Sequence, residues 1–207
     1  MKELLSISPN HYDCIHIDFR YKGESTLDVL ALCLNIDGGV SLASDFVFFN
    51  SNNRGDYSQK AIIPFDSSST SRRHWMDITC PVSSDKSVWL LTDNLEDEDS
   101  EYISERVEIF PSLIRKEVTS IGFVLNFGYG GCGNFFPRDF ERLTKLSIVG
   151  FNKTDMSELF HIVVSPETIK TTSKMVLMVE KKNGKLLINQ IAEDFENGIE
   201  DIVTKYT

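Results

Sequence analysis

The chain has 207 residues, 41% of them hydrophobic, and its 31 acidic against 21 basic side chains give a formal net charge of −10. This length suits one domain with an ordinary core, so we expect residues 1–207 to form a single domain. The acidic balance argues against a nucleic-acid partner, which needs clustered Lys and Arg, and against adhesion to anionic lipid without an intervening cation.

Most of the chain has the character of short β-strands separated by turn residues. His11–Phe19 alternates polar and apolar side chains near its end, as a half-buried strand does. The Asn183-Gly184 pair lies between two alternating runs and predicts a tight hairpin, because both residues adopt positive φ at low cost. The remaining predicted strands are Leu27–Leu34, Asp45–Phe49, Ser87–Leu91, Arg106–Phe110, Ser120–Phe127, Leu146–Phe151, Leu159–Val164, Met175–Glu180 and Lys185–Ile191.

Two segments depart from this strand pattern. Residues 51–86 are rich in Ser, Asn and Asp and predict either a long loop or an inserted hairpin with strands near Ile62 and Trp75. After Phe195, apolar residues recur at helical spacing up to Tyr206, which predicts a C-terminal helix. The expected fold class is therefore mainly β: a two-sheet antiparallel β-sandwich with a long inserted loop or hairpin and a C-terminal helix.

The first residues, MKELLSISPNHYD, contain too short an apolar run for a secretory signal, and no apolar stretch is long enough to span a membrane. Cysteines at positions 14, 33, 80 and 132 show neither CxxC nor metal-ligand spacing. We therefore expect a cytoplasmic protein with reduced thiols and no transmembrane segment.

The outstanding chemical feature is the acidic run from Asp93 to Glu105, which carries seven carboxylates and no Lys or Arg. Such a run is either a solvated acidic loop or a site for a hard divalent cation with oxygen ligands. From charge spacing alone, the candidate ligands within it are Asp97, Asp99 and Glu101. An EF-hand is excluded, because Tyr102 stands where that loop needs Gly.

Other motifs give weaker signals. The Gly-rich run 127–134 lacks the P-loop pattern, and the four histidines show no HExxH or Cys–His spacing that would indicate zinc. No nucleophile elbow occurs. The chain has 31 acidic residues, so no particular pair of carboxylates is indicated as a catalytic acid and base. We therefore expect no catalytic residues and no enzyme activity.

Several ordered segments resemble the TerD-type tellurium-resistance and bacterial stress protein family. Thr26–Asn35 followed by Asp37-Gly38-Gly39-Val40 is similar to the family's DLDASAFLLN-x-DGKV, and Asp45–Asn50 to its FVFFNN strand. Thr92-Asp93-Asn94-Leu95 and the later Glu105–Ile109 resemble its GDNxTGxGxGDDE motif and the strand that follows. The segments Val118–Val124, Asn134-Phe135-Phe136 and Met175–Gln190 also match in order.

The resemblance implies a noncatalytic β-sandwich that binds one or two Ca²⁺ ions through acidic loops. It also implies a role in a stress and tellurite-resistance response, within an assembly of other proteins near the inner membrane face. The positions that match the calcium motif are Asp28, Asp93, Asn94 and Glu105. The chain departs from the motif at Thr26 and Thr92, and acidic residues and Ser replace the motif's glycines.

Two alternatives follow from these departures and from the insertion. One is a calcium-free interaction scaffold that keeps the fold but has a degenerate metal site. The other is an enzyme whose pocket is formed by the 51–86 insertion and the Gly-rich run.

Overall fold

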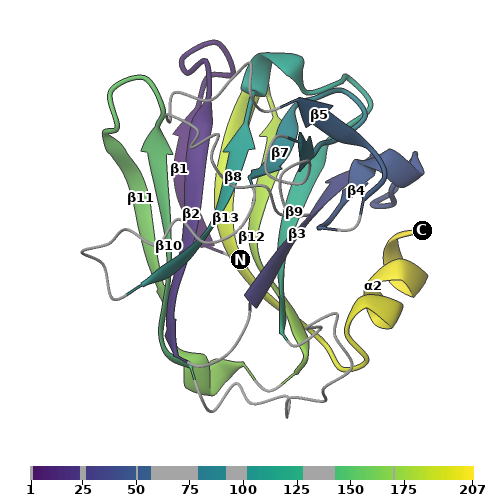
Figure 1. Cartoon of the computed structure of the whole chain (residues 1–207). Helices are drawn as coiled ribbons and strands as arrows, with labels where there is room; N and C mark the ends of the chain where they lie inside the picture. The colour runs from purple at the N-terminus through teal and green to yellow at the C-terminus, as the bar shows by residue number, and fades with distance from the viewer. Residues whose placement is uncertain are drawn as a thin grey trace, which may run out of the picture.

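Two antiparallel β-sheets pack face to face (Figure 1) in the computed structural model of the chain, which describes residues 2–23, 27–49, 51–56, 79–91, 102–127, 143–169 and 171–207. The six-stranded sheet has the order β1 (Lys2–Ile7), β13 (Lys185–Phe195), β12 (Ser173–Lys182), β9 (Ser120–Phe127), β3 (Leu27–Leu34) and β4 (Phe46–Val47). The five-stranded sheet has the order β11 (Glu158–Val164), β10 (Leu143–Asn152), β2 (Ile15–Gly23), β8 (Ile103–Ile109) and β7 (Val88–Leu91). The predicted fold class is confirmed.

The space between the sheets holds the main core, because alternate residues of each strand point inward. On β2 the inward residues are Ile15, Ile17, Phe19 and Tyr21, all buried. Phe19 meets Phe123 of β9 across the core, with ring centroids 6.0 Å apart. Residues between these inward positions, such as His16 and Asp18, therefore lie on the outer face of the five-stranded sheet.

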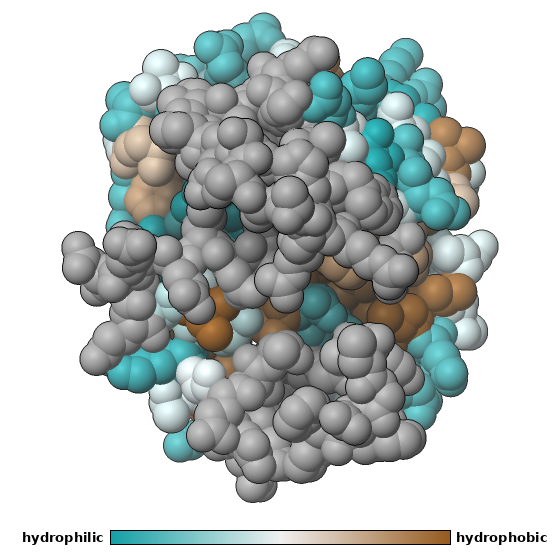
Figure 2. Space-filling view, viewed as in Figure 1, coloured by the Kyte–Doolittle hydropathy of each residue, from teal (hydrophilic) through white to brown (hydrophobic). Residues whose placement is uncertain are grey.

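The C-terminal helix α2 (Ile199–Tyr206) covers part of the outer face of the six-stranded sheet. Ile202 and Tyr206 are its buried residues and pack with Leu30, Leu32 and Val124 in a second apolar cluster. The chain end is also held by a hydrogen bond from the Val40 N–H to the Tyr206 carbonyl (2.6 Å). Figure 2 shows apolar side chains reaching the surface at mid-height on the right, the side on which α2 lies.

Two short strands, one near each end of the inserted segment 51–86, pair with each other. β5 (Arg54–Asp56) pairs antiparallel with β6 (Thr79–Pro81), with Gly55 opposite Cys80. Val82, just after β6, forms a bridge with Trp89 of β7, so the pair adjoins the edge of the five-stranded sheet. The strands predicted near Ile62 and Trp75 lie outside the described residues.

Most predicted strands are present, with shifted ends. Leu27–Leu34 and Ser120–Phe127 coincide with β3 and β9, whereas β2 begins at Ile15 because residues 8–11 form a turn. The predicted Asn183-Gly184 hairpin joins β12 to β13, with φ of 52° and 72° at its two residues. Short 3₁₀ turns lie at Ala43–Asp45, Pro111–Leu113 and Pro166–Thr168. No helix in the described part of the chain has the length and apolar character to cross a membrane.

Candidate functional site

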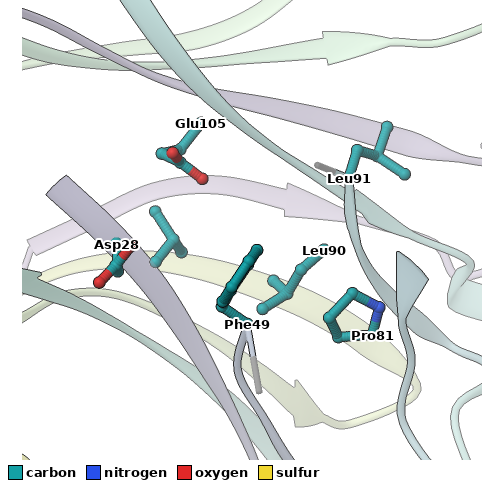
Figure 3. A pocket seen from close by; sticks show the side chains of 7 residues that line it. Asp28, Phe49, Pro81, Leu90, Leu91 and Glu105 are labelled. Carbon is teal, nitrogen blue, oxygen red and sulfur yellow. The ribbon is translucent and has the colours of Figure 1, made fainter. Parts of the chain in front are cut away.

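A small pocket lies where the ends of several strands from both sheets meet (Figure 3). In the view shown, Asp28 lies at the left with its carboxyl group turned away from Phe49, Glu105 lies above, and Pro81 and Leu91 lie at the right. We call this the acidic pocket; its lining residues are Asp28, Val29, Phe49, Pro81, Leu90, Leu91 and Glu105.

Glu105 reaches the pocket from the inner side of β8. It alternates with Val107 and Ile109, which belong to the core, and its strand partner on β2 is the buried Phe19. Only 9% of Glu105 is exposed. Burial of a carboxylate in an apolar row is costly unless hydrogen bonds or a cation compensate for the lost water.

Asp28 is the second residue of β3 and borders the pocket. Its neighbours Leu27 and Val29 belong to the main core, so the Asp28 side chain lies on the outer side of β3, the side of Leu30. Asp28 lies opposite Asn126 of β9 on one side. On the other side of β3, β4 pairs only at Ala31 and Leu32, so Asp28 lies beyond the end of that pairing. β4 ends at Val47, and Phe49, two residues later, lines the pocket.

Two residues that flank or end the acidic run line the pocket. β7 and β8 are antiparallel neighbours, with Leu91 paired to Arg106, and residues 92–101 connect them. Leu91 before the connection and Glu105 after it both line the pocket. The predicted ligands Asp93, Asn94, Asp97, Asp99 and Glu101 all lie in this connection, outside the described residues.

Of the seven ligands predicted from the sequence, the structure thus brings two together and leaves five outside its description. Within the ranges described above, no group of three or more His, Cys, Asp or Glu side chains could hold a metal ion. Two carboxylates have at most four oxygens, so Asp28 and Glu105 cannot complete a Ca²⁺ site, which takes six to eight oxygens.

The apolar wall of the pocket was not predicted. Phe49, Pro81 and Leu90 come from three separate segments, and Pro81 closes β6 at the end of the inserted segment. Nothing in the sequence marks them as neighbours of Asp28. Their contribution is a local environment of low polarity, in which attraction between a carboxylate and a cation is stronger than in water.

The comparisons with known proteins concern the fold. The chain is similar to the crystal structure of a protein of unknown function, with 10% identity, a TM-score of 0.56, and coverage of 89% of this chain and 91% of that one. It is also similar to the structure of a homologue of the telluride resistance protein TerD from Streptomyces coelicolor, with 9% identity, a TM-score of 0.49 and the same coverage. No protein-family model matches the sequence, and no curated protein sequence matches it significantly. At these identities the first similarity shows a shared β-sandwich fold alone, and nothing below rests on the second.

Proposed function

We propose that the chain is a noncatalytic calcium-binding protein that acts through protein interaction in a stress or tellurite-resistance response. The observation that supports this most directly is that Asp28 and Glu105 both line one pocket, although they are 77 residues apart in the sequence. Both were selected from the sequence by resemblance to separate pieces of a calcium motif. That both line one pocket supports the proposal.

Calcium fits the chemistry of this region better than a softer metal. Its ligands are oxygens, and the candidates here are carboxylates and an Asn amide, without His or Cys. The connection between Leu91 and Glu105 carries six further carboxylates between Asp93 and Glu101. Such a density of negative charge repels itself unless a cation or salt neutralises it.

The proposed mechanism is a change of surface charge. One bound Ca²⁺ removes two negative charges from the segment 93–105, which carries seven. A partner protein of the response then meets a less repulsive surface, and its affinity becomes dependent on calcium. Association of charged surfaces is governed by this kind of complementarity.

Calorimetric titration with Ca²⁺ tests the proposal. We expect the wild-type protein to bind calcium, and Asp28→Asn and Glu105→Gln each to weaken binding at least tenfold, because each removes one anionic ligand. The matched control is Glu117→Gln, which removes an equal charge from an exposed loop position distant in sequence from the pocket. Absence of binding by the wild type at millimolar calcium, or equal affinity in all four proteins, contradicts the proposal.

A calcium-free interaction scaffold is the second candidate, favoured by the missing glycines of the motif. Glycines let a loop curl so that backbone carbonyls reach a metal. The double variant Asp93→Asn and Asp99→Asn separates the two candidates by its effect on thermal unfolding. In a scaffold it raises the unfolding temperature with or without calcium, because it relieves repulsion, whereas in a metal site it removes the stabilisation that calcium provides.

A further inference from the structure

A cluster of charged side chains lies on the outer face of the five-stranded sheet, away from the acidic pocket. We call it the His16 cluster; its members are His16, Asp18, Arg20, Arg106, Glu108 and Lys153. The register explains its assembly, because His16 lies opposite Glu108, and Asp18 opposite Arg106, on the antiparallel strands β2 and β8. Lys153 joins from the turn that follows β10.

His16 lies between the two carboxylates of the cluster. Its Nε2 is 3.0 Å from Asp18 Oδ1, and its Nδ1 is 3.7 Å from Glu108 Oε1. All three residues are buried, with 5%, 2% and 1% of their surface exposed. His16 Nδ1 and Glu108 Oε2 are buried without a hydrogen-bond partner. The two atoms without a partner therefore belong to facing side chains, and the approach of 3.7 Å between these side chains, from Nδ1 to Oε1, is beyond hydrogen-bond distance.

The remaining charges hold the two carboxylates in place. Asp18 accepts hydrogen bonds from Arg106 Nε (2.8 Å) and Arg20 Nη2 (2.9 Å), and Glu108 accepts one from Lys153. Burial raises the pKa of both carboxyl groups, but these hydrogen bonds and the nearby His16 outweigh burial and lower both pKa values. Both carboxylates stay ionised at neutral pH. The group that changes charge near neutrality is His16.

We propose that His16 is a proton-operated clamp: when protonated it donates hydrogen bonds to Asp18 and Glu108 together, and when it loses its proton it releases Glu108. The clamp joins β2, β8 and the turn after β10. Lys153 contributes twice, because its side chain bonds Glu108 and its N–H donates to the Cys14 carbonyl (3.1 Å) beside the start of β2. When Glu108 is released from His16, the carboxylate that Lys153 bonds is itself held less firmly. The turn 152–157 is therefore held less firmly against the sheet.

Charges of both signs face His16. β2 contributes Asp18 and Arg20, β8 contributes Arg106 and Glu108, and β10 contributes the uncharged ring of Phe151, 6.4 Å away, with Lys153 beyond it. Burial lowers the pKa of His16, but the hydrogen bond with Asp18 and the nearby carboxylate of Glu108 outweigh burial and raise this pKa above its ordinary value of 6.5. The clamp's contribution to stability is therefore complete below pH 6.5 and is lost as pH rises through the folded-state pKa.

Thermal unfolding of calcium-free protein across pH tests the clamp. Between about pH 6 and about pH 9 we expect the wild type to lose a few degrees of unfolding temperature relative to His16→Gln, which cannot titrate. The matched control, His161→Gln, changes an exposed histidine on β11 of the same sheet and keeps the wild-type pH dependence. Hydrogen exchange of the turn 152–157, corrected for its intrinsic pH dependence, rises with pH in the wild type and not in His16→Gln.

A direct titration keeps the test valid if His16→Gln folds poorly. The His16 imidazole signals of the wild type should titrate above the ordinary midpoint of about 6.5, and Glu108→Gln should bring that midpoint down. A wild-type midpoint at or below the ordinary value overturns the proposal. So does a wild-type unfolding curve whose pH dependence matches that of His16→Gln.

Discussion

Gly150 shows how a single residue determines the packing of the five-stranded sheet. It lies on β10 between Ile17 of β2 and Phe160 of β11, and the buried Phe160 ring covers its backbone. A Cβ atom at this position would overlap the ring carbons. The ring belongs to the main core, so it cannot move away without opening that core.

We therefore expect Gly150→Ala to destabilise the protein by roughly 1–3 kcal/mol, as overpacking of a core does. Urea unfolding measures the change. Ser147→Ala, three residues earlier on the same strand and half-exposed on the opposite face, is the matched control and should change stability little. Equal unfolding midpoints for wild type and Gly150→Ala would show that the sheet yields to admit the methyl group.

At the same scale, the sequence anticipated part of the site and missed the rest. Asp28 and Glu105 were identified because each belongs to a short motif that stands on its own along the chain. Phe49 and Pro81 were not, because their closeness depends on how the ends of β4 and β6 pack. The His16 cluster was missed for a similar reason: Arg106 and Lys153 become its neighbours only through strand pairing. The alternation of His16, Asp18 and Arg20 did carry a signal, since residues two apart on a strand share a face.

At the scale of elements, α2 depends on packing rather than on helix propensity. It has eight residues, too few to be stable alone in water. Its Asp201 side chain bonds the Asn197 N–H (2.9 Å) before the first turn, and Lys205 pairs with Glu193 of β13. Its main anchor is Ile202, which is fully buried against the outer face of the six-stranded sheet.

Truncation at this anchor should release the helix. We expect Ile202→Ala to cost about 2–5 kcal/mol of unfolding free energy, the usual range for a buried aliphatic side chain. Val203→Ala removes an adjacent side chain that is 38% exposed and should stay within about 0.5 kcal/mol of wild type. Chemical denaturation compares the two variants, and similar losses in both would mean that α2 is not anchored as the structure shows.

Strand existence was easier to predict than strand boundaries or pairing partners. Leu27–Leu34 is apolar almost throughout because both faces of β3 are covered, one by the main core and one by the second apolar cluster. β1 was not predicted. It pairs with β13 at the far end of the chain, a contact that no local pattern reveals. The pair β5–β6 was not predicted either. It lies near the ends of the 51–86 segment, outside the apolar positions near Ile62 and Trp75.

At the scale of the whole molecule, the net charge of −10 is concentrated rather than spread. Seven acidic residues lie between Asp93 and Glu105, and the rest of the chain has 24 acidic against 21 basic side chains, a net of −3. Leu91, two residues before that concentrated charge, and Glu105, its last residue, line the acidic pocket. A cation that binds the folded protein there also stabilises it, by about 2.7 kcal/mol at a hundredfold excess over the dissociation constant.

The most direct test of the calcium proposal is a crystal structure of the full chain soaked in CaCl₂. The proposal predicts an ion at the acidic pocket with oxygen ligands at about 2.3–2.6 Å, among them carboxylate oxygens of Asp28 and Glu105. It also predicts that the remaining protein ligands come from the segment 93–101. Saturating calcium that leaves the pocket without an ion, or an ion bound elsewhere on the chain, contradicts it.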